Sequence, residues 1–177
     1  DTMDHASYGV ELLCGERNMI RRFVKEDTWD EIIKTAIAKH SDYKLEGITD
    51  ERTLLHAKLI RDADKLDNCR VKLEEPVEVL LGVSKEEVGK QEITERIWEA
   101  CKRKESIVSA ERVTEIDFWV SYLAYFFDIN FASTYRIIKE ENYVERLIRR
   151  IPYENPDTKE KMQKLCVELN AYVEIFL

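Results

Sequence analysis

Hydrophobic residues recur every three or four positions along most of this chain, which is the spacing of an amphipathic α-helix. No segment shows the alternating pattern of a half-buried strand, so the pattern predicts an all-α fold. One short hairpin is expected around 71–81, where Pro76 interrupts the helical spacing. Helices are expected at 5–14, 17–25, 28–40, 50–68, 94–104, 114–127, 131–141, 142–150 and 157–175.

Capping signals support several of these helix starts. A capping box pairs a Ser or Thr with an acidic or amide residue three positions later, and the two satisfy each other's backbone N–H groups. Such pairs occur at Thr28 with Glu31, Ser84 with Glu87 and Thr114 with Asp117, and Thr49 or Asp50 can cap the helix that follows.

Three polar residues lie on apolar helical stripes: His5, His40 and Asp64. Imidazoles and carboxylates are costly to bury unless they are paired or bound to a metal. Because the three stand on separate segments, the pattern predicts that they converge on one shared site.

Successive residues of an α-helix are rotated by about 100°, which predicts the residues of the Asp64 segment that share its apolar face. Asp64 and Asp67 fall inside its apolar arc, and Asp62 is expected to point to solvent. The other residues expected on the inner side are Ala57, Leu59, Ile60, Ala63 and Leu66, and those expected outside it are Lys58, Arg61 and Lys65.

Composition limits the class of protein. At 177 residues the chain fits one domain, with 1–75 as one part and 76–177 as a helical extension packed on it. The net charge of -8 argues against binding to a nucleic acid duplex. The basic pairs Arg21-Arg22 and Arg149-Arg150 are interpreted as solvated helix faces.

The cysteines and the hydropathy pattern indicate a cytoplasmic protein. Four cysteines lie far apart without a Cys-x-x-Cys pair, which suits a reducing compartment. The most apolar run, residues 116–127, is shorter than the roughly 20 residues that span a bilayer. It contains Asp117 and is better explained as a buried core helix, with its aromatic residues used for packing.

The segments DHASYGVELL, IIKTAIAKHSDYK and LLHAKLIRDADKLDNCRV together resemble the later motifs of the HD-domain superfamily of metal-dependent phosphohydrolases. The resemblance covers about the first 75 residues. It implies an HD-domain-like helical bundle with additional C-terminal helices. Asp64 in Ala63-Asp64-Lys65-Leu66 matches the family's late aspartate, and His5 and His40 match its intermediate histidines.

The chain departs from the family in one respect: the His-Asp pair that names the family, and the histidine before it, are absent. In the family both precede the segment that corresponds to His5. The chain is therefore expected to be the later part of a longer protein, or else a relative that has lost its main ligands.

The resemblance implies a phosphohydrolase that acts on a phosphomonoester, a phosphodiester or a nucleotide. Its cofactor would be a divalent metal (Mn, Fe, Ni, Co, Zn or Mg), with Asp64, His40 and His5 as metal-binding and catalytic residues. Asp64 would be the anionic ligand, and His40 and His5 would bind a second metal or face the phosphate. Such a metal polarises the phosphoryl group and activates a bound water. Asp67 would orient a neighbouring ligand, and Lys44 and Arg61 are the nearest candidates to bind phosphate. The alternative is a non-catalytic helical module that binds a ligand or a partner protein.

Overall fold

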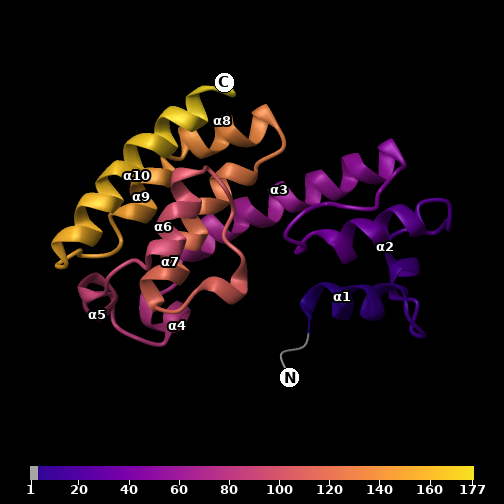
Figure 1. Cartoon of the computed structure of the whole chain (residues 1–177). Helices are drawn as coiled ribbons and strands as arrows, with labels where there is room; N and C mark the ends of the chain where they lie inside the picture. The colour runs from indigo at the N-terminus through magenta and orange to yellow at the C-terminus, as the bar shows by residue number, and fades with distance from the viewer. Residues whose placement is uncertain (1–3) are drawn as a thin grey trace. The chain divides into compact units, whose positions relative to one another are not determined.

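The computed structural model describes residues 4–177, and every regular element in this range is helical (Figure 1). The all-α prediction is therefore confirmed, while the HD-like arrangement stays a prediction. The α-helices are α1 (His5–Cys14), α2 (Asp30–Lys39), α3 (Glu51–Glu74), α4 (Val77–Leu81), α5 (Lys85–Lys90), α6 (Glu95–Lys102), α7 (Glu115–Ala124), α8 (Ala132–Glu140), α9 (Tyr143–Ile148) and α10 (Pro156–Glu174). Three short 3₁₀ helices are η1 (Met19–Arg22), η2 (Ser109–Glu111) and η3 (Tyr125–Asp128).

The chain divides into two compact units, residues 1–64 and 65–177. Unit 1 contains α1, η1, α2 and the first part of α3, and unit 2 contains the rest of α3 and all later helices. The boundary predicted from sequence lies between 75 and 76, whereas the boundary between the two units lies earlier, inside α3. The assignment of all 177 residues to a single domain stays a prediction.

Three of the four predicted helix caps are present. The Thr114 side chain accepts a hydrogen bond from the Asp117 amide, and Asp117 accepts one from the Thr114 amide in return, which completes the capping box of α7. Ser84 accepts from the Glu87 amide at the start of α5. Asp50 caps α3 by accepting from the Thr53 amide at 2.7 Å.

The predicted capping box at Thr28 is wrong. Helix α2 begins at Asp30, and its N-cap residue is Trp29, which makes no side-chain capping bond. The cause is a tight turn in which the Asp30 amide donates to the Asp27 carbonyl at 3.0 Å, so that the helix starts two residues later than the sequence signal. The predicted helix at 17–25 is also reduced, to the single turn Met19–Arg22, after Asn18 adopts a left-handed conformation at φ 44°.

The hairpin predicted around 71–81 is replaced by helix. Helix α3 continues to Glu74, and Pro76 then separates it from α4. Proline has no N–H to continue the backbone hydrogen bonds of α3, but its fixed φ suits a position just before a new helix. Helix α4 ends at Gly82, whose φ of 77° is the left-handed conformation that glycine adopts without steric cost.

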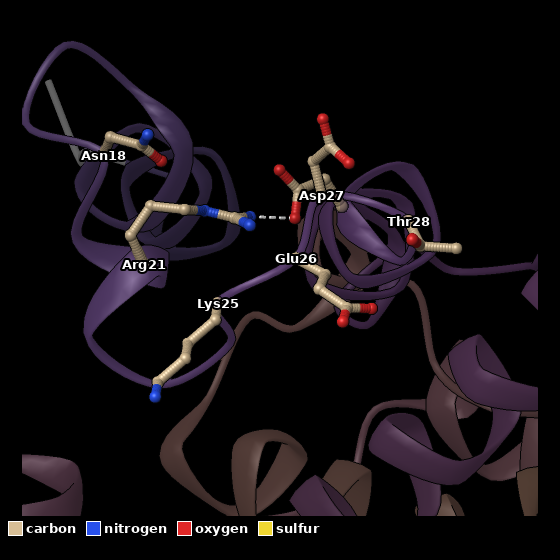
Figure 2. Close-up of a pocket in the computed structure, with 7 residues that line it drawn as sticks. Asn18, Arg21, Lys25, Glu26, Asp27 and Thr28 are labelled. Carbon is tan, nitrogen blue, oxygen red and sulfur yellow. Dashed lines mark hydrogen bonds and ion pairs between the residues drawn. The ribbon is translucent and has the colours of Figure 1, made fainter.

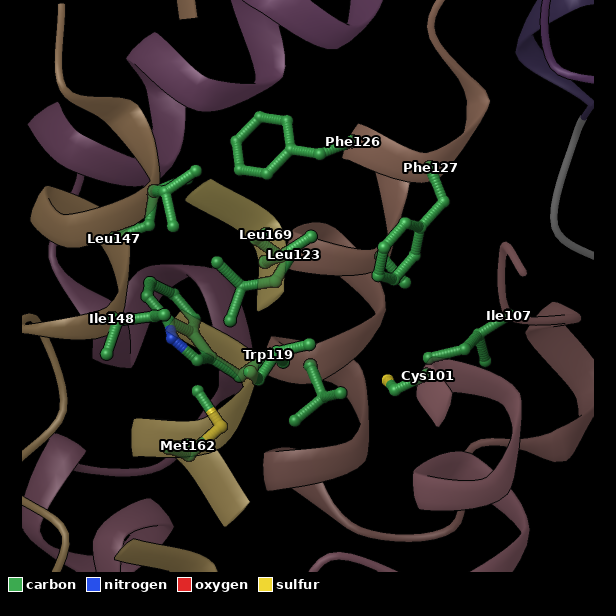
Figure 3. Close-up of a cluster of buried hydrophobic side chains, with 14 of the residues drawn as sticks. Cys101, Ile107, Trp119, Leu123, Phe126, Phe127, Leu147, Ile148, Met162 and Leu169 are labelled. Atoms are coloured by element: carbon green, nitrogen blue, oxygen red, sulfur yellow. The ribbon is translucent and has the colours of Figure 1, made fainter. Parts of the chain in front are cut away.

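The core of unit 2 is a large apolar cluster centred on Trp119 (Figure 3). Trp119 and Leu123 from α7 pack with Leu147 from α9 and with Met162 and Leu169 from α10. Trp119 is 1% exposed. Phe126 and Phe127 are buried in the same cluster, so the interpretation of the aromatic run as packing is confirmed.

Candidate functional site

His5 and His40 come together in unit 1 although 35 positions separate them in the sequence. Their Nε2 atoms lie 3.1 Å apart. The ring centroids are 5.0 Å apart, and the ring planes cross at 73°. Two of the three residues predicted to share a site therefore converge.

His5 is held by the start of α1. It is the first residue of the helix, directly after the N-cap Asp4, whose carboxylate accepts from the amides of Ala6 and Ser7. Hydrogen bonds from the hydroxyl and amide of Ser7, and then from the Ala6 amide, keep the pKa of Asp4 below its ordinary value. A carboxylate thus stays charged beside the His5 imidazole, where it favours a bound cation.

Helices α1 and α2 pack against each other. A Cβ atom added at Gly9 of α1 would lie 3.4 Å from Cγ2 of Ile37 in α2, an ordinary van der Waals contact. The packing of the two helices brings His5 to the end of α2, beside His40.

His40 is fixed at the other end of α2 by two backbone contacts. Its Nδ1 lies 2.7 Å from the carbonyl oxygen of Ile37, one turn earlier in the helix. Its own carbonyl accepts from Arg61 at 3.1 Å, and the Arg61 guanidinium also donates to the carbonyls of Asp42 and Tyr43. Arg61 therefore fastens the segment that follows His40 to α3.

The contact with the Ile37 carbonyl indicates which nitrogen of the His40 ring carries a hydrogen. A carbonyl oxygen can only accept, so Nδ1 of His40 carries the hydrogen and donates to Ile37. In the neutral ring Nε2 then has a lone pair, and this lone pair faces Nε2 of His5. Metal-binding histidines are commonly oriented in this way: the ring nitrogen that does not bind the metal donates its hydrogen to a backbone carbonyl.

The separation of the two nitrogens also fits a shared metal ion. Two imidazole nitrogens at 2.0–2.1 Å from one metal are about 2.8–3.4 Å apart, from neighbouring octahedral positions at the short end to tetrahedral positions at the long end. The observed 3.1 Å falls in this range. Without a metal, the same geometry allows one imidazole to donate Nε2–H to the other.

The convergence of Asp64 with the two histidines stays a prediction. Within residues 4–177 no group of three or more His, Cys, Asp or Glu side chains is arranged to hold a metal ion. Asp64 is exposed, and so is Asp67, which forms an ion pair with Arg70 at 2.8 Å. Asp62, which was expected to face solvent, is 2% exposed.

The predicted phase of α3 is thus wrong, and the reason is electrostatic. Arg61 and Lys65 are buried on the side that was assigned to solvent, whereas Leu59 is 57% exposed. Arg61 is buried because three carbonyls accept from its guanidinium, and Lys65 because it binds the carboxylate and carbonyl of Asp128. Charged groups can be buried when every donor finds a partner.

Two further expectations from the sequence differ from the structure. Arg61 is 5% exposed and three backbone carbonyls accept from its guanidinium, so its burial keeps it away from a phosphate in this conformation. The apolar stripe of α1 that carries His5 was expected to face inward, but its residues Tyr8 and Leu12 are 51% and 37% exposed. His5 therefore lies at the surface of unit 1 and is open to solvent.

Unit 1 also contains an open pocket of about 560 Å³ that sequence analysis did not identify (Figure 2). Arg21 reaches across it to form an ion pair with Asp30. Because cations and acids are mixed in its wall, the pocket shows no preference for a ligand of one charge. Its lining residues are Asn18, Arg21, Lys25, Glu26, Asp27, Thr28 and Asp30.

None of the helices in residues 4–177 combines the length and the apolar character needed to cross a membrane. In comparisons with known proteins, no family model, no curated protein and no solved structure matches the chain.

Proposed function

We propose that His5 and His40 are two imidazole ligands of one divalent metal ion, and that the protein is a metal-dependent phosphohydrolase of HD type. The observation that carries the proposal is the 3.1 Å separation of the two Nε2 atoms, with Nδ1 of His40 committed to the Ile37 carbonyl. The proposed substrate is a phosphomonoester, a phosphodiester or a nucleotide, as the sequence resemblance implies.

The residues of unit 1 would have distinct roles. His5 and His40 would bind the metal through neutral Nε2 atoms, the Ile37 carbonyl would orient the His40 ring, and Arg61 would hold the segment behind it. The bound metal would polarise a phosphoryl oxygen and lower the pKa of a water ligand. Asp64 stays the proposed anionic ligand on the strength of its Ala-Asp-Lys-Leu setting alone, and a complete site of this family would also need a His-Asp pair.

A second candidate is a non-catalytic helical module that binds a ligand or a partner. It is favoured by the absence of any third metal-binding side chain beside the two histidines within residues 4–177. Two imidazoles alone fall short of the four to six ligands that most metal sites use. Metal affinity therefore separates the two candidates.

The first test measures Ni²⁺ or Co²⁺ binding to this chain by calorimetry and by the visible absorption of Co²⁺. The proposal expects weak binding, with one ion per chain, that is lost in both His5→Ala and His40→Ala. His56→Ala is the matched control, because His56 is also half-buried and directs Nδ1 to a carbonyl, that of Arg52, at 2.8 Å. Equal loss in all three variants, or no binding to the unsubstituted chain, would contradict the shared site.

The second test measures hydrolysis of a phosphate ester with Mn²⁺. The 177-residue chain should show little or no turnover, whereas a form extended upstream to include a His-Asp pair should be active. Asp64→Asn in the extended form should abolish turnover by removing an anionic ligand. Glu74→Gln, an exposed carboxylate on the same helix, should leave turnover unchanged. Full activity after Asp64→Asn would exclude Asp64 as a ligand.

A further inference from the structure

Three cations gather around one open pocket of unit 2, of about 440 Å³. Arg149 and Arg150 follow α9, and Lys85 is the first residue of α5. The remaining lining residues are Pro76, Val77 and Glu78, so Glu78 is the one acidic residue beside three basic ones in the lining. This local excess of positive charge contrasts with the net charge of -8 on the whole chain.

Arg150 is held in place by the end of α3. Its guanidinium donates to the carbonyls of Leu73 and Glu75, the latter at 2.8 Å. These two bonds satisfy carbonyl groups that the helix end leaves without partners. A guanidinium has five N–H donors. Arg150 therefore has a fixed position and keeps donors for a ligand.

Arg149 and Lys85 provide adaptable charges at the rim of the pocket. Arg149 is 78% exposed and forms one ion pair, with Glu145 at 3.0 Å. Lys85 is exposed, and its ammonium group enters none of the ion pairs found within residues 4–177. Lys85 thus has all three of its donors available.

We propose that Lys85, Arg149 and Arg150 bind the phosphate group of a small phosphorylated molecule. Planar guanidinium groups match phosphate oxygens with paired hydrogen bonds, and a lysine adds a point charge. The pocket volume is within the range of small-molecule sites, roughly 300–1,000 Å³. The site belongs to unit 2 and does not depend on the proposed metal site in unit 1.

The test is calorimetric titration of the full chain with inorganic pyrophosphate and with inorganic phosphate, in EDTA at constant ionic strength. Pyrophosphate should bind with one site per chain and more tightly than phosphate. The Lys85→Gln/Arg149→Gln variant should bind about tenfold or more weakly, because two charge-assisted contacts are lost. Arg150 is left intact because its contacts stabilise the end of α3.

The matched control is Lys102→Gln/Arg103→Gln, which removes the same charge from another exposed pair, at the end of α6. It should leave pyrophosphate affinity unchanged, as should His40→Ala. Circular dichroism checks that each variant is folded. If the unsubstituted chain does not bind pyrophosphate, or if both double variants weaken binding equally, the site is excluded; loss in His40→Ala would instead place the anion in unit 1.

Discussion

The two units are stabilised in different ways. The buried apolar residues described in unit 1 are small, apart from one isoleucine: Ala6, Ile20, Ala36 and Ala57. Unit 2 instead contains a continuous apolar cluster with Trp119, Phe126 and Tyr135 fully buried. Large apolar side chains supply most of the burial free energy in a folded protein. Unit 1 therefore depends more on specific polar contacts.

Those polar contacts also determine the position of the candidate metal ligands. Arg61 binds three carbonyls of the segment 40–43, and Arg21 binds Asp30 at the start of α2. The histidine pair is thus located in the part of the molecule where charge, and not apolar area, fixes the backbone. We expect unit 1 to be sensitive to loss of charged groups and unit 2 to loss of apolar volume.

The largest expected effect is that of Trp119→Ala in unit 2. Removing a 1%-exposed tryptophan should lower the free energy of unfolding by about 3–5 kcal/mol, since a large cavity is created. Chemical denaturation followed by circular dichroism measures this change. The control in unit 1 is Phe23→Ala, at a residue that is 75% exposed, which should change stability by no more than about 0.5 kcal/mol. Similar losses in the two variants would contradict the comparison.

The next effect is that of Arg61→Met in unit 1. The substitution keeps much of the side-chain volume but removes the donors to three carbonyls, and should cost about 2–3 kcal/mol. Hydrogen exchange should then accelerate in residues 36–44, with loss of metal binding at His40. Arg70→Met, an exposed arginine on the same helix, should leave exchange in that segment unchanged. Unchanged exchange in Arg61→Met would show that charge does not fix the segment.

A smaller effect is expected for Gly89→Ala in unit 2. A Cβ atom at this position would collide with the carbonyl of Pro152, and the Gly89 carbonyl also accepts from the amides of Glu154 and Asn155. The collision should destabilise unit 2 by about 1–3 kcal/mol. Gly47→Ala tests backbone strain alone. The φ of 76° at this position is unfavourable for alanine, but no heavy atom lies within 4 Å of the added Cβ. It should cost about 1 kcal/mol or less.

The smallest effect is the pH dependence of the first turn of α1. The pKa of Asp4 is lower in the folded chain than its ordinary value of 3.8, chiefly because of the Ser7 hydroxyl and amide. The stabilisation that ionised Asp4 gives to the folded chain is therefore complete above about pH 3.8. It is lost as the pH falls through the lower pKa that Asp4 has in the folded chain. Amide exchange at Ala6 and Ser7 should accelerate in that range. Asp4→Asn should remove this acid dependence; if exchange in that variant still accelerates at low pH, another group is responsible.

Much of the helical architecture could be predicted from local sequence. Helix α1 has the predicted bounds, and the caps at Asp50, Ser84 and Thr114 form as expected, because each depends on residues within one turn. The predictions at Thr28 and at 71–81 failed where a neighbouring turn or the continuation of a long helix overrode the local signal. The sequence also predicted that His5 and His40 would meet.

The sequence by itself determined the helical class and the approximate position of most helices, since periodicity and capping are local properties. Only the tertiary structure decided which face of α3 is buried. Arg61 and Lys65 are buried because their partners, the carbonyls of 40–43 and Asp128, are far away in the sequence. A hydrophobicity pattern cannot register such partners, so it assigned Asp62 to solvent and Asp64 to the interior, the reverse of what is observed.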